Sequence, residues 1–517
     1  MDVSWMPEWF LGLFRWSFSL TNGMPFIPWL TLLLWFPLFG AIAVLVFKGG
    51  RAKAFAAVFS GITMIIAFLV YLVPRFGTGS MADLTESYVW MDVLNVKINY
   101  ILVVDDLSVL MVGLTGLLVF LMTIFAGKDK PSSFFALLLA MEVGLMGVYL
   151  SQDYFMFFIF WEVTLIPMYF MISMFGGPRR HYASMKFLIY THVASMVMLV
   201  GIFALVFQAG AGGTIDFSFA AVSAAAASFT PAFQTLVFGL LFFGFAVKMP
   251  VVPFHTWLPD AHVEAPTEGS VLLAAVMLKM GSYGIIRICL QLHEGALAWQ
   301  NIMIVVALIA IVYGAYACIA QKDLKKMIAY SSISHMGMVL LGIAVFTSDG
   351  MAFAIFQMFA HGLISAVLFM VAGIVGHNAG TREIPLLGGL AKRMPKYAGF
   401  VVLAFLASLG LPGLIGFAAE FGIMYSFYAY LESTGMIWAI VFVLLGLMLT
   451  AGYYMWAMQR TIFGRETTKI DMEHVHDTNR SETVVLTLVC ILIVLFGVMP
   501  GLITDIAYSA AGVIPWI

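Results

Sequence analysis

The chain contains 517 residues, of which 62% are hydrophobic and only 10% are charged. Soluble domains carry about a quarter charged residues, so this composition excludes a water-soluble globular protein and predicts a chain solvated by lipid. A net charge of −2 offers no basic surface to nucleic acid, and three scattered cysteines argue against an iron–sulfur cluster or covalent haem in this chain.

The N-terminal stretch is apolar but contains Pro7, Glu8 and Arg15, and no small-residue cleavage site follows it. We therefore expect an interfacial amphipathic helix in a 1–28 extension, rather than a signal peptide. Residues 29–517 are expected to form one transmembrane domain.

A helix that spans the membrane needs about 20 mostly apolar residues. Stretches of this kind are centred near residues 38, 64, 115, 142, 164, 197, 243, 280, 311, 336, 363, 413, 448 and 495. The longer loops lie near residues 75–103, 209–233, 377–397 and 461–483. The predicted fold is an all-α polytopic membrane protein with about 14 transmembrane helices.

The basic residues are distributed unequally between the two sides of the predicted membrane domain. Nineteen lysines and arginines, Lys325 among them, fall in loops on one side and three on the other. Because positive charge marks cytoplasmic loops, both termini are predicted to lie outside the cytoplasm. The expected location is the cytoplasmic membrane of a prokaryote or an equivalent energy-converting membrane.

Two predicted spans are interrupted by prolines and glycines. The seventh span is interrupted at 248–253 and the twelfth at 410–413. An offset of five spans inverts topology, so residues 131–291 and 302–460 are predicted to form an inverted repeat with one broken helix in each half. Broken helices at corresponding positions are typical of transporters.

Five charged residues lie in mostly apolar stretches without charged neighbours: Glu142, Glu162, Lys248, Lys279 and Glu420. Each charge costs roughly 2.5–3.5 kcal/mol on insertion scales, and intramembrane ionisable residues usually mark ion pathways. The alternatives are structural ion pairs between helices and side chains that extend to the interface.

Two histidines, His335 and His361, lie between Lys279 and Glu420 in chain order. Neutral imidazole can pass protons, so both are candidate relay groups. Hydrogen-bonded core histidines and a pair of haem ligands are the alternatives. His474 and His476 lie in a polar loop and are expected to be solvated, with metal binding as the alternative.

Two specific motifs carry a family resemblance. They are residues 160–170 (FWEVTLIPMYF) and 248–270 (KMPVVPFHTWLPDAHVEAPTEGS). Both resemble the antiporter-like subunits in the membrane arm of respiratory complex I, closest to subunit M (chain 4), with a likeness from about residue 30 to 505. Pro266-Thr267-Glu268 and Glu420 resemble subunit M, whereas subunits L and N have proline-threonine-proline and lysine there.

The resemblance implies a proton-translocating subunit of a redox-driven pump, in which Glu162, Lys248, Lys279 and Glu420 match the family's buried charges and the two histidines lie between them. Our hypothesis is that Glu162 and Lys248 form a switchable ion pair, and that Lys279 and the histidines pass the proton on to Glu420. Glu142 is a secondary candidate from its position alone. No cofactor is expected in this chain. Iron–sulfur clusters, flavin or other electron carriers, and a quinone-type acceptor, are expected in partner subunits.

The implied partners are antiporter-like paralogues in the membrane and peripheral redox subunits. The main alternative is a subunit of a multi-subunit Na⁺/H⁺ antiporter, which resembles the same family. A polytopic membrane enzyme such as a lipid transferase and a structural scaffold are further alternatives. The electron donor and the choice between H⁺ and Na⁺ stay open.

Overall fold

The computed structural model describes residues 20–21, 24–25, 28–47, 51–77, 84–470, 475–512, 514 and 516. The interfacial helix expected in the 1–28 extension is not tested, because only residues 20–21, 24–25 and 28 of that extension are described. Strands β1 (Leu20–Thr21) and β2 (Met24–Pro25) form a short antiparallel pair.

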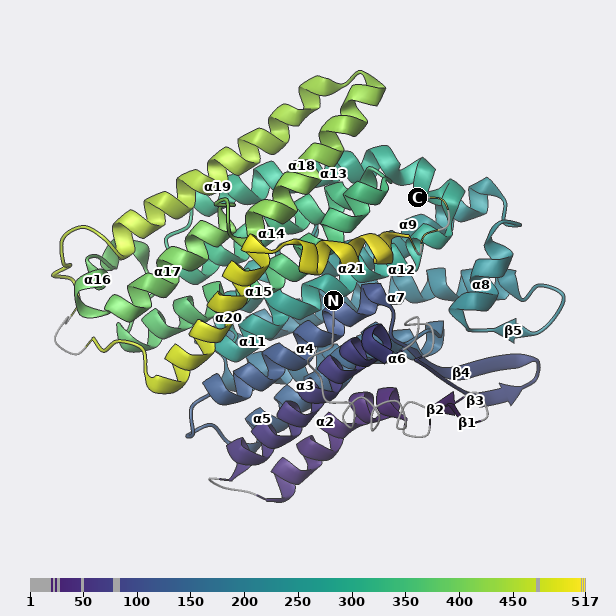
Figure 1. The fold of residues 1–517 in the computed structure, drawn as a ribbon, viewed down its shortest axis with the longest axis horizontal. Helices are drawn as coiled ribbons and strands as arrows, with labels where there is room; N and C mark the ends of the chain where they lie inside the picture. The colour runs from purple at the N-terminus through teal and green to yellow at the C-terminus, as the bar shows by residue number, and fades with distance from the viewer. Residues whose placement is uncertain are drawn as a thin grey trace. The chain divides into compact units, whose positions relative to one another are not determined.

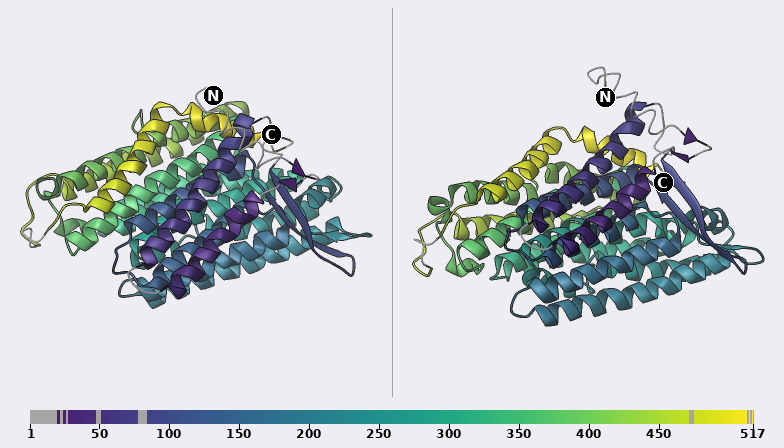
Figure 2. Two further views of the ribbon diagram at one scale, coloured as in Figure 1. Left: turned by 60° about the horizontal axis from the view of Figure 1, so that its bottom comes forward. Right: turned by 90° about the horizontal axis from the view of Figure 1, so that it is seen from below.

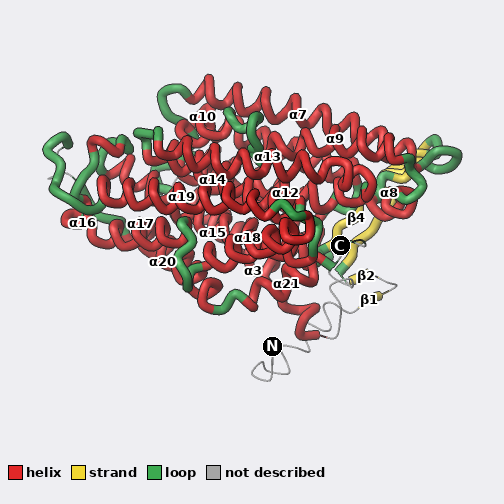
Figure 3. Tube along the Cα trace, turned by 90° about the horizontal axis from the view of Figure 1, so that it is seen from above, coloured by secondary structure: helices red, strands yellow, loops and turns green. Residues whose placement is uncertain are grey.

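The chain is an integral membrane protein built almost entirely of helices (Figures 1 and 3). Thirteen stretches of the described chain are long and apolar enough to span a membrane, and each coincides with a predicted span. They comprise α2 (Trp29–Val46), α3 (Ala52–Gly77), α4 (Asp106–Phe125), α5 (Ser132–Leu150), α6 (Tyr154–Phe175), α7 (Arg180–Ala209), α9 (Pro231–Lys248), the run α11–η2–α12 (Thr267–Leu272, Leu273–Met277, Leu278–Arg287) with η3 (Cys289–Gln291), α13 (His293–Ile319), α14 (Leu324–Ala344), α15 (Ser348–Asn378), η5 (Ile437–Ala439) with α19 (Ile440–Thr461), and α20 (Arg480–Val498).

The remaining predicted span, near residue 413, is divided into α17 (Pro395–Ser408) and α18 (Ile415–Thr434). The turn between them has positive φ at Gly410 (+79°) and Gly413 (+90°), a conformation that glycine adopts without steric cost. The predicted break at 410–413 is therefore present. Shorter elements complete the described helices: α8 (Phe219–Ala226), α10 (Trp257–Glu264), η4 (Ile384–Leu386), α16 (Leu390–Arg393) and α21 (Gly501–Ala511).

The chain divides into two compact units. The first comprises residues 1–167 and 197–241, and the second comprises residues 168–196 and 242–517. In the first unit, α2 packs against α3 and α5, and α4 packs against both α3 and α5. In the second unit, α15 packs against α14, α17, α18, α20 and α21, so the core of this unit lies around α15.

The first unit contains a β-hairpin where the sequence predicted a loop. Strands β3 (Thr85–Val93) and β4 (Val96–Val103) pair antiparallel, and β5 (Ile215–Asp216) adds to β4 in parallel. The hairpin lies at the N-terminal end of α2 (Figure 2), where the Glu86 carboxylate accepts hydrogen bonds from the Leu30 and Thr31 backbone. Leu94 and Asn95 form the turn with positive φ at both positions, as two-residue hairpins require.

Candidate functional site

Lys279 is the starting point of a polar array inside the second unit. It lies in α12 directly after η2, a π-helical turn, and its side chain is fully buried. Its Nζ donates to the Ala274 carbonyl in η2 at 2.6 Å and lies 2.6 Å from Nδ1 of His361 on α15. A π-helical turn alters the regular carbonyl ladder, and such turns occur frequently at functional sites. The lysine is therefore held against a histidine by the backbone of its own helix.

The array continues from His361 to a carboxylate on α18. The rings of His361 and His335, which lies on α14, have centroids 5.5 Å apart. His335 Nδ1 lies 2.8 Å from Oε1 of Glu420, and Gln357 on α15 also donates to that oxygen at 3.2 Å. All four side chains are buried. Four predicted residues, Lys279 included, are thus brought together in one unit, with His361 beside the lysine and His335 beside the carboxylate.

Lys248 is the last residue of α9 and is 1% exposed. The helix ends here because Pro250 and Pro253 lack the backbone N–H groups that would continue it. The indole of Trp257 donates to the Val247 carbonyl at 3.0 Å, which satisfies one acceptor that the broken helix releases. Lys248 Nζ lies 5.6 Å from the ring centroid of Phe187, a cation–π distance.

A glycine brings the helix of Lys279 against the end of α9. A Cβ added to Gly281 would lie 2.5 Å from the Phe245 carbonyl and 2.8 Å from the Met249 backbone nitrogen. Glycine therefore permits a backbone approach that no other residue would. This contact places the helices of Lys248 and Lys279 side by side within the second unit.

The two remaining predicted residues belong to the first unit. Glu162 is half-buried on α6. Glu142 on α5 is fully buried, and neither of its carboxylate oxygens has a hydrogen-bond partner in the described part of the chain. Because Glu162 and Lys248 lie in different units, their ion pair stays a prediction.

The sequence analysis assigned no role to His262 and counted Lys325 as a loop cation, although both are buried in the second unit. His262 stacks on Phe369 with ring centroids 4.3 Å apart, and neither ring nitrogen has a hydrogen-bond partner among the described residues. It interacts electrostatically with both Lys325 and Lys279. Lys325 Nζ donates to the Ala265 carbonyl at 2.6 Å. His262 lies within one of the two family motifs, so the sequence offered a signal for it, whereas nothing in the sequence distinguishes the buried Lys325 from Lys322 and Lys326 in the same basic cluster.

A polar cavity of about 650 Å³ lies beside Lys325. Its lining includes Glu264, Asp323 and Arg382. Arg382 Nε lies 3.4 Å from Asp323, and its guanidinium donates to the Val263 carbonyl at 3.1 Å. A polar space of this size is large enough for roughly 20 water molecules at about 30 Å³ each.

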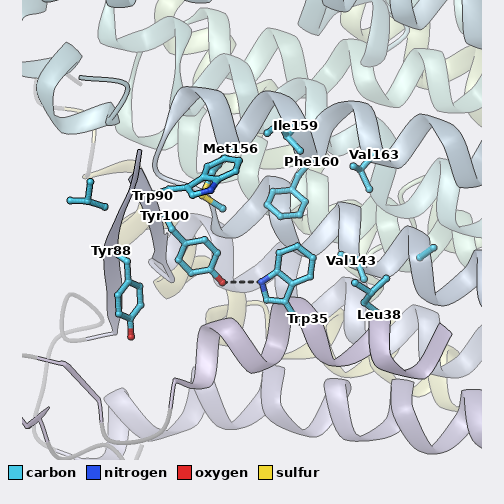
Figure 4. A pocket seen from close by; sticks show the side chains of 12 residues that line it. Trp35, Leu38, Tyr88, Trp90, Tyr100, Val143, Met156, Ile159, Phe160 and Val163 are labelled. Atoms are coloured by element: carbon cyan, nitrogen blue, oxygen red, sulfur yellow. Dashed lines mark hydrogen bonds between the residues drawn. The ribbon is translucent and has the colours of Figure 1, made fainter. Parts of the chain in front are cut away.

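A second cavity, of about 620 Å³, lies in the first unit (Figure 4). Trp35 donates to the Tyr100 hydroxyl at 3.2 Å, and the other lining residues are mostly aromatic or aliphatic. Among the described residues, the lining contains no lysine, histidine or carboxylate. It therefore offers no chain of groups that could pass a proton, and the candidate site is the array in the second unit.

Comparison with known proteins identifies the family. Residues 151–451, more than half of the chain, match the family described as NADH:quinone oxidoreductase/Mrp antiporter, transmembrane region. The F(420)H(2) dehydrogenase subunit M of Methanosarcina mazei is 39% identical over 93% of this chain and 96% of its own length. The chain belongs to the subunit M/chain 4 family.

Two further similarities support the family assignment. NADH-quinone oxidoreductase subunit M of Rickettsia felis is 34% identical over 93% of this chain and 97% of its own length. A chain of the respiratory complex I from Thermus thermophilus with bound NADH superposes with a TM-score of 0.84 and 26% identity, over 94% of this chain and 98% of that chain. The resemblance to subunit M inferred from the two motifs is therefore confirmed.

His335 and His361, which the sequence left open as a pair of haem ligands, do not fit a haem site. Both ring nitrogens of His335 are engaged, one with Glu420 and the other with the Ser408 hydroxyl at 3.1 Å. Neither is left to bind iron. Within the described ranges, no group of three or more His, Cys, Asp or Glu side chains is placed to hold a metal ion. His474 lies outside the described residues.

Proposed function

We propose that this subunit M-type chain translocates protons across the membrane as part of a redox-driven quinone oxidoreductase of the complex I type. The observation that carries the proposal is the buried array of Lys279, His361, His335 and Glu420, in which an amine, two imidazoles and a carboxylate follow one another at close range. A structural ion pair would need only the lysine and the carboxylate. The two imidazoles that lie between Lys279 and Glu420 add groups that can both accept and donate a proton.

Protons reach Lys279 in this scheme from the polar cavity beside Lys325. The loops that form the cavity include residues 176–177 and 380–383, next to the basic loops predicted to face the cytoplasm. The buried His262 interacts electrostatically with both Lys325 and Lys279. Water in the cavity would supply Lys325, and His262 would pass the proton to Lys279.

The step from Lys279 to His361 needs a driving force. Unperturbed lysine and histidine differ by about 4 pKa units, which corresponds to about 5 kcal/mol. Pairing of Glu162 with Lys248 at about 4 Å, in an effective dielectric of about 20, is worth roughly 4 kcal/mol. When that pair opens, Lys248 becomes an uncompensated charge on the helix beside Lys279 and repels its proton toward His361. The two energies are comparable, so opening and closing the pair can drive the transfer.

The energy for opening the pair comes from outside the chain. Electron transfer in partner subunits, which would hold the iron–sulfur clusters, flavin or other carriers and the quinone, supplies it. Moving one charge against about 100 mV costs about 2.3 kcal/mol, less than the energy of the ion pair. Glu420 then releases the proton on the side opposite the basic loops.

The test is Lys279→Ala in the intact complex, reconstituted into liposomes. We expect electron transfer in the presence of an uncoupler to persist and the protons moved per electron pair to fall more than tenfold. The matched control is Lys392→Ala, which removes an exposed lysine paired with Glu466 at 3.6 Å. Full pumping in Lys279→Ala, measured with a pH-sensitive dye, contradicts the proposal.

A sodium/proton antiporter is the second candidate, because the matching family includes Mrp antiporter subunits. An antiporter would acidify or alkalinise the same liposomes in response to an imposed sodium gradient without any electron donor. Proton movement that requires electron transfer and is independent of sodium favours the redox-driven pump.

A further inference from the structure

A chain of hydroxyl groups leads away from the second ring nitrogen of His335. Nε2 lies 3.1 Å from the Ser408 hydroxyl, which donates to the Tyr454 hydroxyl at 2.8 Å. Tyr454 donates to Ser331 at 3.0 Å, and Ser331 donates to the Ile328 carbonyl at 2.8 Å. The three hydroxyl residues lie on α17, α19 and α14, and their side chains are buried. This chain is separate from the array that links Lys279 to Glu420.

The carbonyl at the end of the chain fixes the direction of every hydrogen bond in it. A carbonyl has no hydrogen to donate, so Ser331 must donate to Ile328. A hydroxyl has one hydrogen, so Ser331 can only accept from Tyr454, and Tyr454 can only accept from Ser408. Ser408 has then used its own hydrogen and must accept from His335. Nε2 of His335 therefore carries a hydrogen in both the neutral and the charged ring.

The fixed hydrogen on Nε2 determines what happens on the other side of the ring. Neutral His335 has its lone pair on Nδ1, which faces Oε1 of Glu420 at 2.8 Å. If Glu420 were also ionised, two lone pairs would face each other at hydrogen-bond distance. One proton must therefore lie between Nδ1 and Oε1, either as a glutamic acid beside neutral histidine or as a glutamate beside imidazolium.

We propose that Ser408, Tyr454 and Ser331 are positioning residues that set the tautomer of His335, so that the His335–Glu420 pair retains one shared proton. The inference rests on the proposed function, because it gives the pair its place as the last store on the proton route. The hydroxyl chain itself does not conduct, since a proton sent along it would end on an amide carbonyl. Because both ring nitrogens of His335 are engaged, the stored proton leaves the pair through the Glu420 carboxyl.

The pair is surrounded by few other titratable groups. The ring of His361 on α15 lies next to His335, and Lys279 on α12 contacts the far side of His361. Tyr454 on α19 is linked to the pair through Ser408. Gln357 on α15 and Ser408 on α17 contribute neutral groups. Tyr453 interacts with Tyr454 electrostatically and through its hydroxyl group, and Cys318 interacts with Tyr454 electrostatically. A change in the proton affinity of the pair on removal of one hydroxyl therefore reports on the tautomer.

The decisive variant is Tyr454→Phe, which keeps a ring against Phe405 and removes the hydroxyl. Ser408 can then turn its hydrogen toward His335, and the neutral ring can move its hydrogen to Nδ1 and donate to ionised Glu420. The deprotonated His335–Glu420 pair is stabilised by that hydrogen bond, so the shared proton is lost at lower pH. We expect the alkaline limb of proton pumping by the reconstituted complex to move toward acid by about one pH unit, since misdirecting a buried hydrogen bond changes an equilibrium roughly tenfold.

Three companion variants make the result specific. Ser408→Ala removes the acceptor for Nε2 and should shift the limb in the same direction, whereas Ser408→Thr retains a hydroxyl and should restore the original profile. Ser426→Ala removes a buried hydroxyl of α18 that donates to the Gly422 carbonyl and is not a member of the chain, and should leave the profile unchanged. An unshifted limb in Tyr454→Phe, or an equal shift in Ser426→Ala, overturns the inference.

Failure of the proposed function gives a different result. If His335→Ala and Glu420→Gln pump normally, the array carries no protons and the proposed function fails. If both variants stop pumping while Tyr454→Phe and Ser408→Ala keep the original pH profile, only the role of the hydroxyl chain is wrong.

Discussion

Lys248 is buried where α9 ends, and three features of its surroundings keep it there. Prolines stop the helix, the indole of Trp257 satisfies a released carbonyl, and the ring of Phe187 lies within cation–π distance of Nζ. Aromatic contacts stabilise a cation by about 0.5–2 kcal/mol, which is less than the cost of burying it. The aromatic contact alone therefore does not offset the cost of burial, and in the proposed function pairing with Glu162 adds to that contact.

Two substitutions of Lys248 can distinguish a role of its positive charge from a role in releasing its own proton. Lys248→Arg retains a cation that cannot be deprotonated, whereas Lys248→Ala removes the cation. If the residue acts only by pairing with Glu162, the arginine variant should retain most of the pumping and the alanine variant less than about a tenth, the factor that 1.4 kcal/mol produces. If Lys248 must release its own proton, both should fail. Pumping in liposomes decides between these roles, with exposed Lys322→Ala as the control, and normal pumping in Lys248→Ala contradicts a role for this lysine.

At the residue level, charge in an apolar segment was an informative signal. It predicted Lys279 and Glu420, and the histidines between them followed from chain position and family motif. The signal failed for Ser408 and Tyr454, because hydroxyl residues are common in membrane helices and their partners come from distant helices. It also failed for Lys325, since a lysine in the first turn of a helix reads as a loop cation until its burial is known.

At the level of elements, two irregularities bring the candidate residues to the array. The π-helical turn η2 supplies the carbonyl that holds Lys279, and the break at Gly410 precedes the helix of Glu420. A Cβ on Gly410 would lie 3.2 Å from Oε2 of Glu420, so the glycine leaves room beside the carboxylate. The prolines and glycines of 248–253 and 410–413 predicted both breaks. The π-helical turn has no sequence signature in Leu273–Met277, and the hairpin turn at Leu94-Asn95 lacks the usual glycine, so both were missed.

Asp153 connects the hairpin to the start of α6 and provides a test of local stability. Its carboxylate accepts hydrogen bonds from the backbone of Asn99 at 2.9 Å and of Phe155 at 2.9 Å. Burial raises the pKa of this carboxyl to about 6, against the effect of those hydrogen bonds. The group lies between the spans of α5 and α6, so it belongs to the connection rather than to the membrane helices.

The raised pKa predicts a definite sign for the pH dependence. Between about pH 4 and about pH 6 the folded form binds more protons than the unfolded form, so the stability of the connection falls as the pH rises, by up to about 3 kcal/mol. Hydrogen exchange of residues 96–103 and 154–156, corrected for the intrinsic rate, should show weaker protection at pH 7 than at pH 5. Asp153→Asn should remove most of this difference. Protection that increases with pH in the unmodified protein contradicts the assignment.

At the scale of the whole molecule, the proposed function gives the chain a route for protons that it cannot drive alone. In this proposal the polar cavity, the buried array and the broken helices serve uptake, transfer and release, and the energy comes from an associated reaction. A two-electron transfer across about 300 mV releases about 14 kcal/mol, since 30 mV corresponds to about 1.4 kcal/mol. Several protons at about 2.3 kcal/mol each per 100 mV can be moved with that energy. A redox partner is therefore sufficient, and a sodium gradient is the competing source.

Isolation of the native assembly distinguishes these two sources of energy. We expect the chain, solubilised in a mild detergent, to remain bound to antiporter-like paralogues and to peripheral subunits that contain iron–sulfur clusters, detected by iron content and electron paramagnetic resonance. Such a complex should reduce a quinone-type acceptor, and quinone reduction in liposomes should generate a proton gradient that Lys279→Ala abolishes. An iron-free assembly of membrane subunits that exchanges protons for sodium would instead identify the antiporter. The same array of Lys279, His361, His335 and Glu420 would then serve a different energy source, because in the proposed function the array sets the path of the proton and the partner subunits supply the energy.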